Sequence, residues 1–247
     1  MTFDLKRLIK SGLNRIGLDV VRIRNSPRQT LLGLRSRPIQ TIIDVGANSG
    51  QFASRISEYF PDATIYCFEP LPGPFTVLSE WANSQNGRVW PLNFAVGDKE
   101  GEVEIYLHED HTPSSSLLAT TKLAERYYPF IREQTRIVVR RKTLDVAFDE
   151  IRVKLLREIL IKLDVQGYED RVIAGGSRLF SEASACIVEV SVDALYKGQA
   201  AFADLLKMLD GLGFRYAGNL DQTYGDDGHC IFLDAVFLRR ERGCAAK

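Results

Sequence analysis

The ten residues Thr41-Ile42-Ile43-Asp44-Val45-Gly46-Ala47-Asn48-Ser49-Gly50 carry the strongest structural signal in the chain. The first five form a short run rich in β-branched side chains, which predicts a buried strand, and a helix is predicted directly after the turn, at 51–59. A turn made of glycines and small side chains lets a ligand approach the backbone beside a helix N-terminus. The spacing Gly46-x-x-x-Gly50 differs from the G-x-G-x-x-G of dinucleotide-binding proteins, and no phosphate-binding lysine follows it. With Asp44 in the strand itself, the turn favours a cationic ligand over a pyrophosphate.

Short strands and helices alternate along the rest of the chain, which is typical of a parallel sheet with helices between its strands. The segment 97–143 interrupts this rhythm, and we expect it to form an inserted hairpin that covers the substrate. Outside the insertion, the expected strands are 64–69, 89–96, 159–165 and 185–190, with a closing hairpin of 214–218 and 231–238, and the expected helices are 74–83, 169–174 and 202–212. Inside it, we expect a strand at 103–107, a polar loop, a helix near 120–131 and a strand at 137–139.

Glu69 ends the second predicted strand, where a carboxylate can accept hydrogen bonds from both hydroxyls of a ribose. The carboxyl ends of parallel strands meet at one edge of the sheet, so Glu69 and the turn after Asp44 should face the same ligand. A nucleoside without phosphates, bound at that edge, indicates S-adenosylmethionine. The alternative is that Glu69 caps the turn that begins at Pro70.

Several further motifs stand in order along the chain, and together they resemble the FkbM family of S-adenosylmethionine-dependent methyltransferases over about residues 40–238. They are Asp44-Val45-Gly46-Ala47-Asn48-x-Gly50, Phe68-Glu69-Pro70, Asn93-x-Ala95-Val96-Gly97-Asp98, Ser114-Ser115-Ser116, Thr143-Leu144-Asp145 and Lys162-Leu163-Asp164-Val165-Gln166-Gly167-Tyr168-Glu169. Gln166 departs from the family pattern, because many members carry Glu there. An acid–base role is therefore not assigned to that position.

The resemblance implies an α/β, class I methyltransferase (Rossmann-like) fold, which is a seven-stranded, mostly parallel sheet with helices on both faces and an antiparallel last strand. It implies S-adenosylmethionine as cofactor, and methyl transfer to a hydroxyl, most often of a sugar in a glycan, a glycolipid or a natural product. The glycine turn would surround the methionine part of the cofactor, Glu69 would hold the ribose, and Asp164 would lie on the sulfonium side. The cofactor-binding residues that it implies are Asp44, Gly46, Ala47, Asn48, Gly50, Glu69, Pro70, Asn93, Ala95, Val96 and Asp164.

A hydroxyl is a poor nucleophile until its proton is removed, so a base is expected near the sulfonium side. Asp164 and Glu189 end adjacent predicted strands and should face one crevice, which makes them the catalytic candidates. Alternatively, Asp164 hydrogen-bonds the cofactor or the backbone, and Glu189 pairs with a nearby Lys or Arg. These carboxylates with Asp193 are oxygen ligands of the kind Mg²⁺ prefers, but we predict no required metal. His108, His111 and His229 are further candidates for the base, but solvated loop histidines are more common than catalytic ones, and His229 is expected to be structural. Candidates for contact with the substrate are His108, His111, Ser115, Ser116 and Tyr168.

The chain divides into a basic N-terminal extension, 1–38, and a predicted methyltransferase domain, 39–240. Residues 1–40 carry nine Lys/Arg and two Asp/Glu, a balance of +7, and because the 247-residue chain is neutral overall, residues 41–247 carry −7. Apolar residues of 5–16 share one face of a predicted helix, which either packs on the domain or contacts an anionic membrane through residues 1–20, or an acidic partner. The negative balance of the domain argues against nucleic-acid binding.

Two other functions are compatible with this pattern: an NAD-dependent oxidoreductase on a similar sheet, and a non-catalytic binding module tethered to a membrane by the extension. No apolar run is long enough to span a bilayer, and Lys6, Arg7, Lys10 and Arg15 interrupt any signal-peptide core. The four cysteines lie far apart, without metal-ligand spacing. We therefore expect a cytoplasmic protein with reduced thiols, and the sequence leaves its oligomeric state open.

Overall fold

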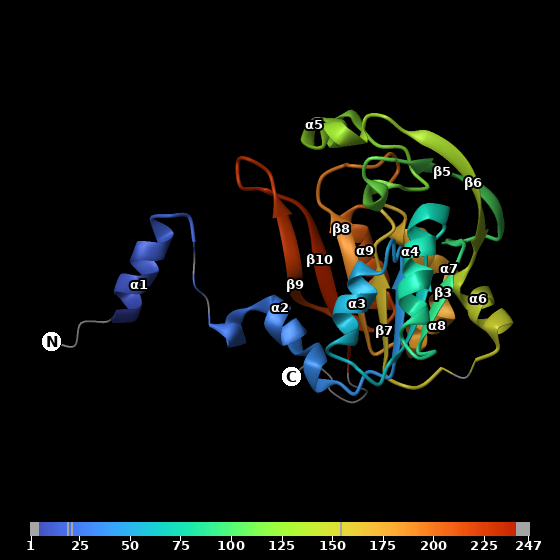
Figure 1. The fold of residues 1–247 in the computed structure, drawn as a ribbon, viewed down its shortest axis with the longest axis horizontal. Helices are drawn as coiled ribbons and strands as arrows, with labels where there is room; N and C mark the ends of the chain where they lie inside the picture. Colours follow the sequence, from blue (N-terminus) through green and yellow to red (C-terminus); the bar gives the residue numbers. More distant parts are fainter. Residues whose placement is uncertain (1–4, 19, 21, 154, 241–247) are drawn as a thin grey trace.

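The computed structural model describes residues 5–18, 20, 22–153 and 155–240 (Figure 1). The side chains of residues 5–8, which belong to the predicted amphipathic face, and Cys244 lie outside what it describes. Cys67, Cys186 and Cys230 are free thiols. Among the described residues, no helix has both the length and the apolar character that crossing a bilayer requires.

A seven-stranded sheet forms the centre of the domain. Its strands are β1 (Thr41–Val45), β2 (Thr64–Phe68), β3 (Val89–Leu92), β7 (Ile159–Leu163), β8 (Ala185–Ser191), β9 (Phe214–Tyr224) and β10 (Cys230–Arg239). They are arranged in the order β3-β2-β1-β7-β8-β10-β9, and β10 runs opposite to the other six strands, antiparallel to both β8 and β9. The predicted α/β class I methyltransferase fold, with a closing hairpin that supplies the reversed strand, is confirmed.

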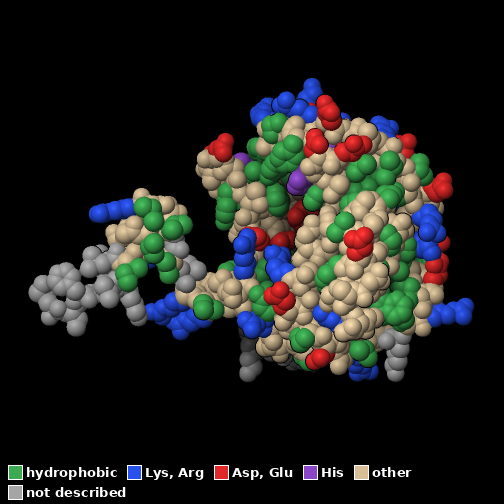
Figure 2. Space-filling model, viewed as in Figure 1, with side chains coloured by type: hydrophobic (Ala, Val, Ile, Leu, Met, Phe, Trp, Pro, Cys, Tyr) green, Lys and Arg blue, Asp and Glu red, His purple; other side chains and the backbone are tan. Residues whose placement is uncertain are grey.

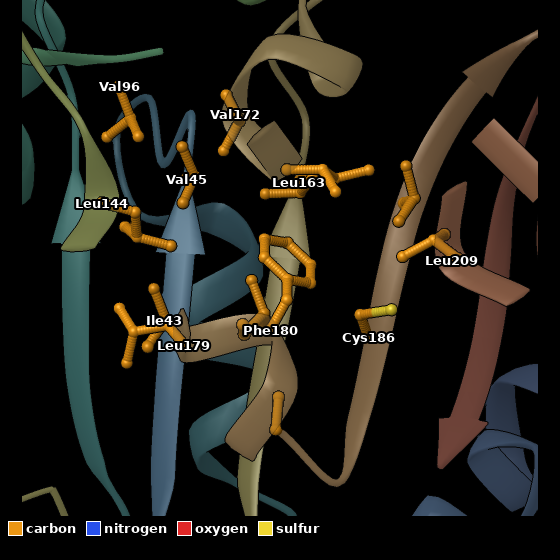
Figure 3. Close-up of a cluster of buried hydrophobic side chains, with 14 of the residues drawn as sticks. Ile43, Val45, Val96, Leu144, Leu163, Val172, Leu179, Phe180, Cys186 and Leu209 are labelled. Atoms are coloured by element: carbon orange, nitrogen blue, oxygen red, sulfur yellow. The ribbon is translucent and has the colours of Figure 1, made fainter. Parts of the chain in front are cut away.

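Helices cover both faces of this sheet, and the alternation of side chains along each strand explains how both faces are filled. In β1, Ile43 and Val45 belong to a core with α6 (Leu144–Ile151), α7 (Glu169–Gly175), α8 (Ser177–Glu182) and α9 (Phe202–Gly211) (Figure 3). Ile42 belongs to a second core, on the opposite face, with α3 (Gln51–Ser57) and α4 (Pro72–Asn83). The turns at the carboxyl ends of the parallel strands are thus held between two packed layers.

The segment 97–143 and the two residues of β4 (Ala95–Val96) build a second, three-stranded sheet over one end of the main sheet (Figure 1). We call 97–143 the cover segment. It contains β5 (Gly101–Leu107), α5 (Lys122–Tyr127), a 3₁₀ turn (Pro129–Ile131) and β6 (Thr135–Lys142), in the sheet order β4-β6-β5.

Two predicted elements within or beside the cover were wrong in extent. The strand predicted at 89–96 divides in two, because β3 ends at Leu92 and β4 pairs with Arg141 and Lys142 of β6 instead of β2. The helix predicted at 120–131 ends at Tyr127, since Pro129 disfavours helical geometry in the residue before it, and Tyr128 has φ −130° and ψ 79°. The predicted strand 137–139 is part of the longer β6.

The N-terminal extension contains α1 (Leu5–Asn14), a 3₁₀ turn (Ile23–Asn25), α2 (Pro27–Thr30) and a second 3₁₀ segment (Leu31–Ser36). Leu31 and Leu34 are buried in the core beneath α3, so the end of the extension packs on the domain. In contrast, α1 stands apart from the domain (Figure 1), and Ile9 and Ile16 are 53% and 70% exposed. Ile9 and Ile16 of the predicted apolar face therefore do not pack on the domain, whereas Leu13 is partly buried.

Candidate active site

A cavity of about 300 Å³ opens at the carboxyl ends of β1, β2 and β7, beneath the cover segment. In the space-filling view the molecule is hollowed at this place, and acidic side chains are visible inside (Figure 2). One end of the cavity is apolar and is lined by Leu71, Ala95, Val96, Ile105 and Leu117. The other end is lined by charged side chains of β1, β7 and β10. A ligand with an apolar ring at one end and charges at the other suits this division.

The turn after β1 has a backbone that only certain residues allow. Gly46 has φ +82°, and a Cβ built on it would lie 1.9 Å from the carbonyl oxygen of Asp164. Asn48 also has positive φ, at +46°, which Asn adopts more readily than most residues. The amides of Gly46 and Ala47 both donate to the carbonyl oxygen of Phe68, at 3.0 Å each. The turn is therefore pressed against the end of β7 and hydrogen-bonded to the end of β2.

Glu69 is buried and lines the cavity, and it also holds the two neighbouring turns. Its Oε2 accepts from the amide of Asn48 at 2.8 Å, and its Oε1 accepts from the amide of Leu71 at 2.7 Å. Because each carboxylate oxygen can accept more than one hydrogen bond, these bonds leave capacity for a ligand. Burial raises the pKa of Glu69 to about 7. The geometry is thus compatible with both predicted roles, ribose contact and turn cap.

Asp44 provides an unfilled acceptor at the charged end of the cavity. It is 1% exposed, and its Oδ2 has no hydrogen-bond partner among the residues described. Burial raises the pKa of Asp44 to about 7, against the opposing effect of Lys162. A buried polar atom without a partner is costly, so a ligand donor at this oxygen would be favourable. The methionine part of S-adenosylmethionine carries an ammonium group of this kind, and the site fits that cofactor.

Asn93 and Gly50 are the two predicted cofactor residues that do not line the cavity; the other nine do. The Asn93 side chain donates to the carbonyl oxygens of Glu69 and Pro70, at 2.9 and 3.2 Å. Gly50 has φ +87° and lies close to Leu78, beneath the start of α3. The structure therefore gives these two residues contacts that hold the turns.

Asp164 and Glu189, the predicted catalytic pair, meet at the amide of Gln166. The Gln166 Nε2 donates to Asp164 Oδ1 at 2.7 Å and to Glu189 Oε1 at 2.6 Å, and its Oε1 accepts from the hydroxyl of Tyr196 at 2.6 Å. Burial, with nearby Asp164, raises the pKa of Glu189 well above its usual range. Asp164 lines the cavity, whereas Glu189 lies behind it. Gln166 is bound to the cover as well, since Ser116 Oγ donates to its carbonyl oxygen at 2.7 Å.

Sequence analysis did not identify Lys162 and Asp234, which line the charged end of the cavity. Lys162 Nζ lies 3.1 Å from Asp164 Oδ2 and 3.4 Å from Asp234 Oδ1. Lys162 is the single charged residue of β7, Ile159–Leu163, and Asp234 is the single charged residue in the apolar inner part of β10. Because charged residues are rarely buried without a partner, that contrast was the signal available in the sequence.

The predicted substrate residues divide into two groups. Ser115, Ser116 and Tyr168 line the cavity, and the two histidines do not. His108 is 1% exposed, not solvated, and its Nδ1 lies 3.2 Å from the carbonyl oxygen of Glu133. His111 Nδ1 lies 2.8 Å from Ser114 Oγ.

His229 and Asp193 belong to a separate surface cluster, in which His229 Nε2 lies 3.0 Å from Asp193 Oδ2 and Tyr127 donates to the same oxygen at 2.7 Å. Asp193 is therefore engaged away from Asp164 and Glu189. Within the described part of the chain, no group of three or more His, Cys, Asp or Glu side chains has the arrangement of a metal site.

Comparison with known proteins places these motifs in context. A model of the methyltransferase FkbM domain matches residues 44–216. The chain is 27% identical to 2-O-methyltransferase NoeI of Sinorhizobium fredii (strain NBRC 101917 / NGR234), over 72% of this chain and 74% of that protein. It is also 27% identical to 31-O-demethyl-FK506 methyltransferase FkbM of Streptomyces tacrolimicus, over 78% of this chain and 79% of that protein. Among solved structures, magnesium protoporphyrin IX methyltransferase of Synechocystis PCC 6803 with bound SAM is 14% identical, with a TM-score of 0.44, and the match covers 97% of this chain and 99% of that one.

Proposed function

Because the chain belongs to the FkbM methyltransferase domain family, we propose that it transfers a methyl group from S-adenosylmethionine to a hydroxyl oxygen of an acceptor. It is a methyltransferase, and S-adenosylmethionine is its cofactor. The names of two relatives, a 2-O-methyltransferase and a 31-O-demethyl-FK506 methyltransferase, support oxygen as the atom methylated. These matches do not support the alternative of an NAD-dependent oxidoreductase.

One observation carries the proposal: the turn after β1, the buried Glu69 and the buried Asp44, whose Oδ2 has no hydrogen-bond partner among the described residues, all line one cavity. Glu69 and the apolar end of the cavity would hold the adenosine part of the cofactor. Asp44 and the turn at Gly46 and Asn48 would hold the methionine part. When bound, S-adenosylmethionine supplies an electrophilic methyl group on a positively charged sulfur.

We assign removal of the hydroxyl proton to Asp164. This residue lines the cavity, and its carboxylate is held on both oxygens, by Gln166 on Oδ1 and by Lys162 on Oδ2. A base held in one orientation contributes to the rate because its carboxylate is already placed to accept the proton of the acceptor hydroxyl. Glu189 reaches the cavity only through the Gln166 amide, so its part in the reaction is to support Asp164.

The acceptor that we propose is a sugar hydroxyl, in a glycan, a glycolipid or a natural product. Ser115, Ser116, Asp164 and Tyr168 all line the cavity. The Ser115 hydroxyl accepts from the amide of His108, and the Ser116 hydroxyl donates to the carbonyl oxygen of Gln166 and accepts from the amide of Leu118, so each hydroxyl keeps capacity for a further hydrogen bond. A polyhydroxylated ring needs several hydrogen-bond partners and packs well on an aromatic face. The acceptor is therefore expected between the cover segment and the end of β7.

Two measurements test this function in order. Titration calorimetry with S-adenosylmethionine and S-adenosylhomocysteine should show binding to the full chain, and Glu69→Ala should weaken it at least tenfold. The exposed Glu58→Ala is the matched control and should bind like the unaltered protein. Methyl-labelled cofactor is then incubated with a panel of pyranosides, phenols and amines. Absence of cofactor binding, or label transfer to nitrogen alone, would contradict the proposal.

We further infer that the N-terminal extension contacts an anionic membrane surface, and the predicted cytoplasmic location would then be at the membrane face. Ile9, Ile16, Leu18 and Ile23 are more than half exposed, and basic residues lie between them. Sedimentation with anionic vesicles should be lost in Ile9→Asp/Ile16→Asp, while Val138→Asp, at an equally exposed position in β6, should leave it unchanged. Failure of the full chain to sediment with any anionic vesicle would remove this contact.

A further inference from the structure

Charged side chains from four adjacent strands form a row on one face of the main sheet. Asp44 lies on β1, Lys162 and Asp164 on or just after β7, Glu189 on β8 and Asp234 on β10. Asp44 is paired in register with Lys162, and Glu189 with Asp234. The residues two positions away in these strands, among them Ile42, Leu160, Ile187 and Val236, all belong to the core beneath α3 and α4. Since alternate residues share a face, the row lies on that face, at its carboxyl edge.

The row has one cation for four carboxylates. Lys162 is 3% exposed and pairs with Asp164 and Asp234, and these two carboxylates, with Glu189 and Asp44, keep its ammonium group charged by raising its pKa. Arg55, the other basic residue that lines the cavity, is exposed and lies in the last turn of α3. The inner end of the cavity therefore has an excess of negative charge.

Two oxygens of the row are left without a donor. Asp44 Oδ2 and Asp234 Oδ1 are buried and have no hydrogen-bond partner among the described residues, although Asp234 Oδ1 is ion-paired with Lys162 at 3.4 Å. Both residues line the cavity, as does Asp164. An incompletely neutralised, weakly solvated set of carboxylates attracts a positive charge more strongly than an exposed set does. These oxygens therefore indicate a cationic ligand independently of the family match.

We propose that this row, with Asp234 and Lys162 as positioning residues, distinguishes S-adenosylmethionine from S-adenosylhomocysteine by charge. The inference rests on the proposed function, because it assumes that both ligands occupy this cavity. In the transfer the carbon–sulfur bond breaks, a carbon–oxygen bond forms, the sulfur keeps the electron pair and the acceptor proton passes to the base. The ligand thereby changes from a sulfonium to a neutral thioether. The row then loses its attraction for the ligand at the moment when the product must leave.

Protonation of the row makes the discrimination dependent on pH. Burial raises the pKa of Asp44 to about 7 and that of Glu189 well above the usual value, so the row gains negative charge as the pH rises through neutrality. Discrimination in favour of the sulfonium should rise with it. The ammonium and carboxylate groups of the two ligands are the same and cancel in the ratio of their dissociation constants. The other titratable groups near the row are Cys67 of β2, Glu69 directly after β2, Glu169 of α7 and Tyr196 after β8.

Titration calorimetry on the full chain tests the proposal without an acceptor. The dissociation constants of both ligands are measured at about pH 6 and about pH 8. One additional charge at about 8 Å, with an effective dielectric constant of about 20–40, changes affinity roughly 5- to 30-fold. The dissociation constant of S-adenosylhomocysteine divided by that of S-adenosylmethionine should therefore rise at least fivefold from about pH 6 to about pH 8. An analogue with a protonated amine in place of the methylsulfonium should follow the cofactor and not the product.

The variant Asp234→Asn removes one charge of the row with little change of shape. It should lower the ratio of the two dissociation constants at about pH 8 by roughly fivefold. The affinity for S-adenosylhomocysteine should stay within about twofold of that of the unaltered protein, which also shows that the variant is folded. Asp62→Asn, at an exposed carboxylate far from the cavity, is the matched control and should change neither constant. A ratio independent of pH in the unaltered protein, or unchanged in a binding-competent Asp234→Asn, overturns the proposal and leaves the methyltransferase function standing. If neither ligand binds, the proposed function itself is refuted, and the discrimination with it.

Discussion

Replacing Gly46 with alanine tests the close contact on which the cofactor turn is built. The added Cβ would lie 1.9 Å from the carbonyl oxygen of Asp164 and 2.8 Å from its carbonyl carbon. These are backbone atoms, and the Asp164 amide is itself bound to the carbonyl oxygen of Val45 at 3.0 Å. Because the obstacle cannot rotate away as a flexible side chain does, the ends of β1 and β7 must separate.

Two costs add in this variant. The left-handed φ of +82° costs an alanine about 1–2 kcal/mol. Forcing a methyl group into a filled space costs roughly 1–3 kcal/mol more. The free energy of unfolding should therefore fall by about 2–5 kcal/mol, which in a protein of this size lowers the melting temperature by roughly 5–15 °C.

Urea unfolding followed by circular dichroism measures the loss, and two other glycines separate its causes. Gly87 has φ +76° with nothing within 4 Å of an added Cβ, so Gly87→Ala carries only the backbone cost of about 1–2 kcal/mol. Gly73 lies in α4, also with open space, and Gly73→Ala should be neutral or stabilising by up to about 1 kcal/mol. If Gly46→Ala is no less stable than Gly87→Ala, the contact between the turn and Asp164 is refuted.

Three further predictions concern the cavity. Glu69→Gln keeps the shape of the side chain but replaces one acceptor oxygen with an NH₂ donor, which then faces the donating backbone amide of Asn48 or Leu71. Calorimetry should show cofactor affinity reduced by about tenfold, and unchanged affinity would exclude Glu69 from the site. Gln166→Leu removes the donor shared by Asp164 and Glu189, so turnover measured with labelled cofactor should fall while cofactor affinity stays within about threefold. If turnover and cofactor affinity fell equally, Gln166 would serve only cofactor binding. Burial raises the pKa of Asp44 from 3.8 to about 7. Between these two values the folded state keeps a proton that the unfolded state has released. This group therefore makes the free energy of unfolding fall as the pH rises from about 4 to about 7. Urea midpoints should follow that direction, and Asp44→Asn should flatten the profile; an identical slope in the variant would refute the shift.

The sequence predicted the main sheet well because its strands are short apolar runs bounded by glycine and proline. All five residues of β1, Thr41–Val45, are buried, as expected for a central strand that pairs in parallel with β2 on one side and β7 on the other. Predictions failed where a segment joins a different sheet. Nothing in the run 89–96 by itself shows that Ala95 leaves the main sheet to pair with the distant Arg141.

The candidate site was predicted where local chemistry is sufficient and missed where it is not. The turn from Gly46 to Gly50 requires positive φ, and the strand-end carboxylates Glu69 and Asp164 are recognisable by position. His108 was predicted to contact the substrate because it lies in a polar loop, but the cover folds over it and it does not line the cavity. Burial of that kind depends on neighbours that are remote in sequence.

The sequence alone determined the alternation of strands and helices, the positive-φ turn and the family, since these depend on side chains a few residues apart and on the backbone freedom of glycine. Only the tertiary structure decided that Lys162 lies between Asp164 and Asp234. It also decided that Gln166 bonds both catalytic candidates through its side-chain amide and the cover through its backbone carbonyl oxygen. Asp234 reaches the cavity because β10 reverses direction and pairs with β8. Which charges share a cavity is set by the order and register of strands distant in sequence, and by the burial that then changes their pKa values.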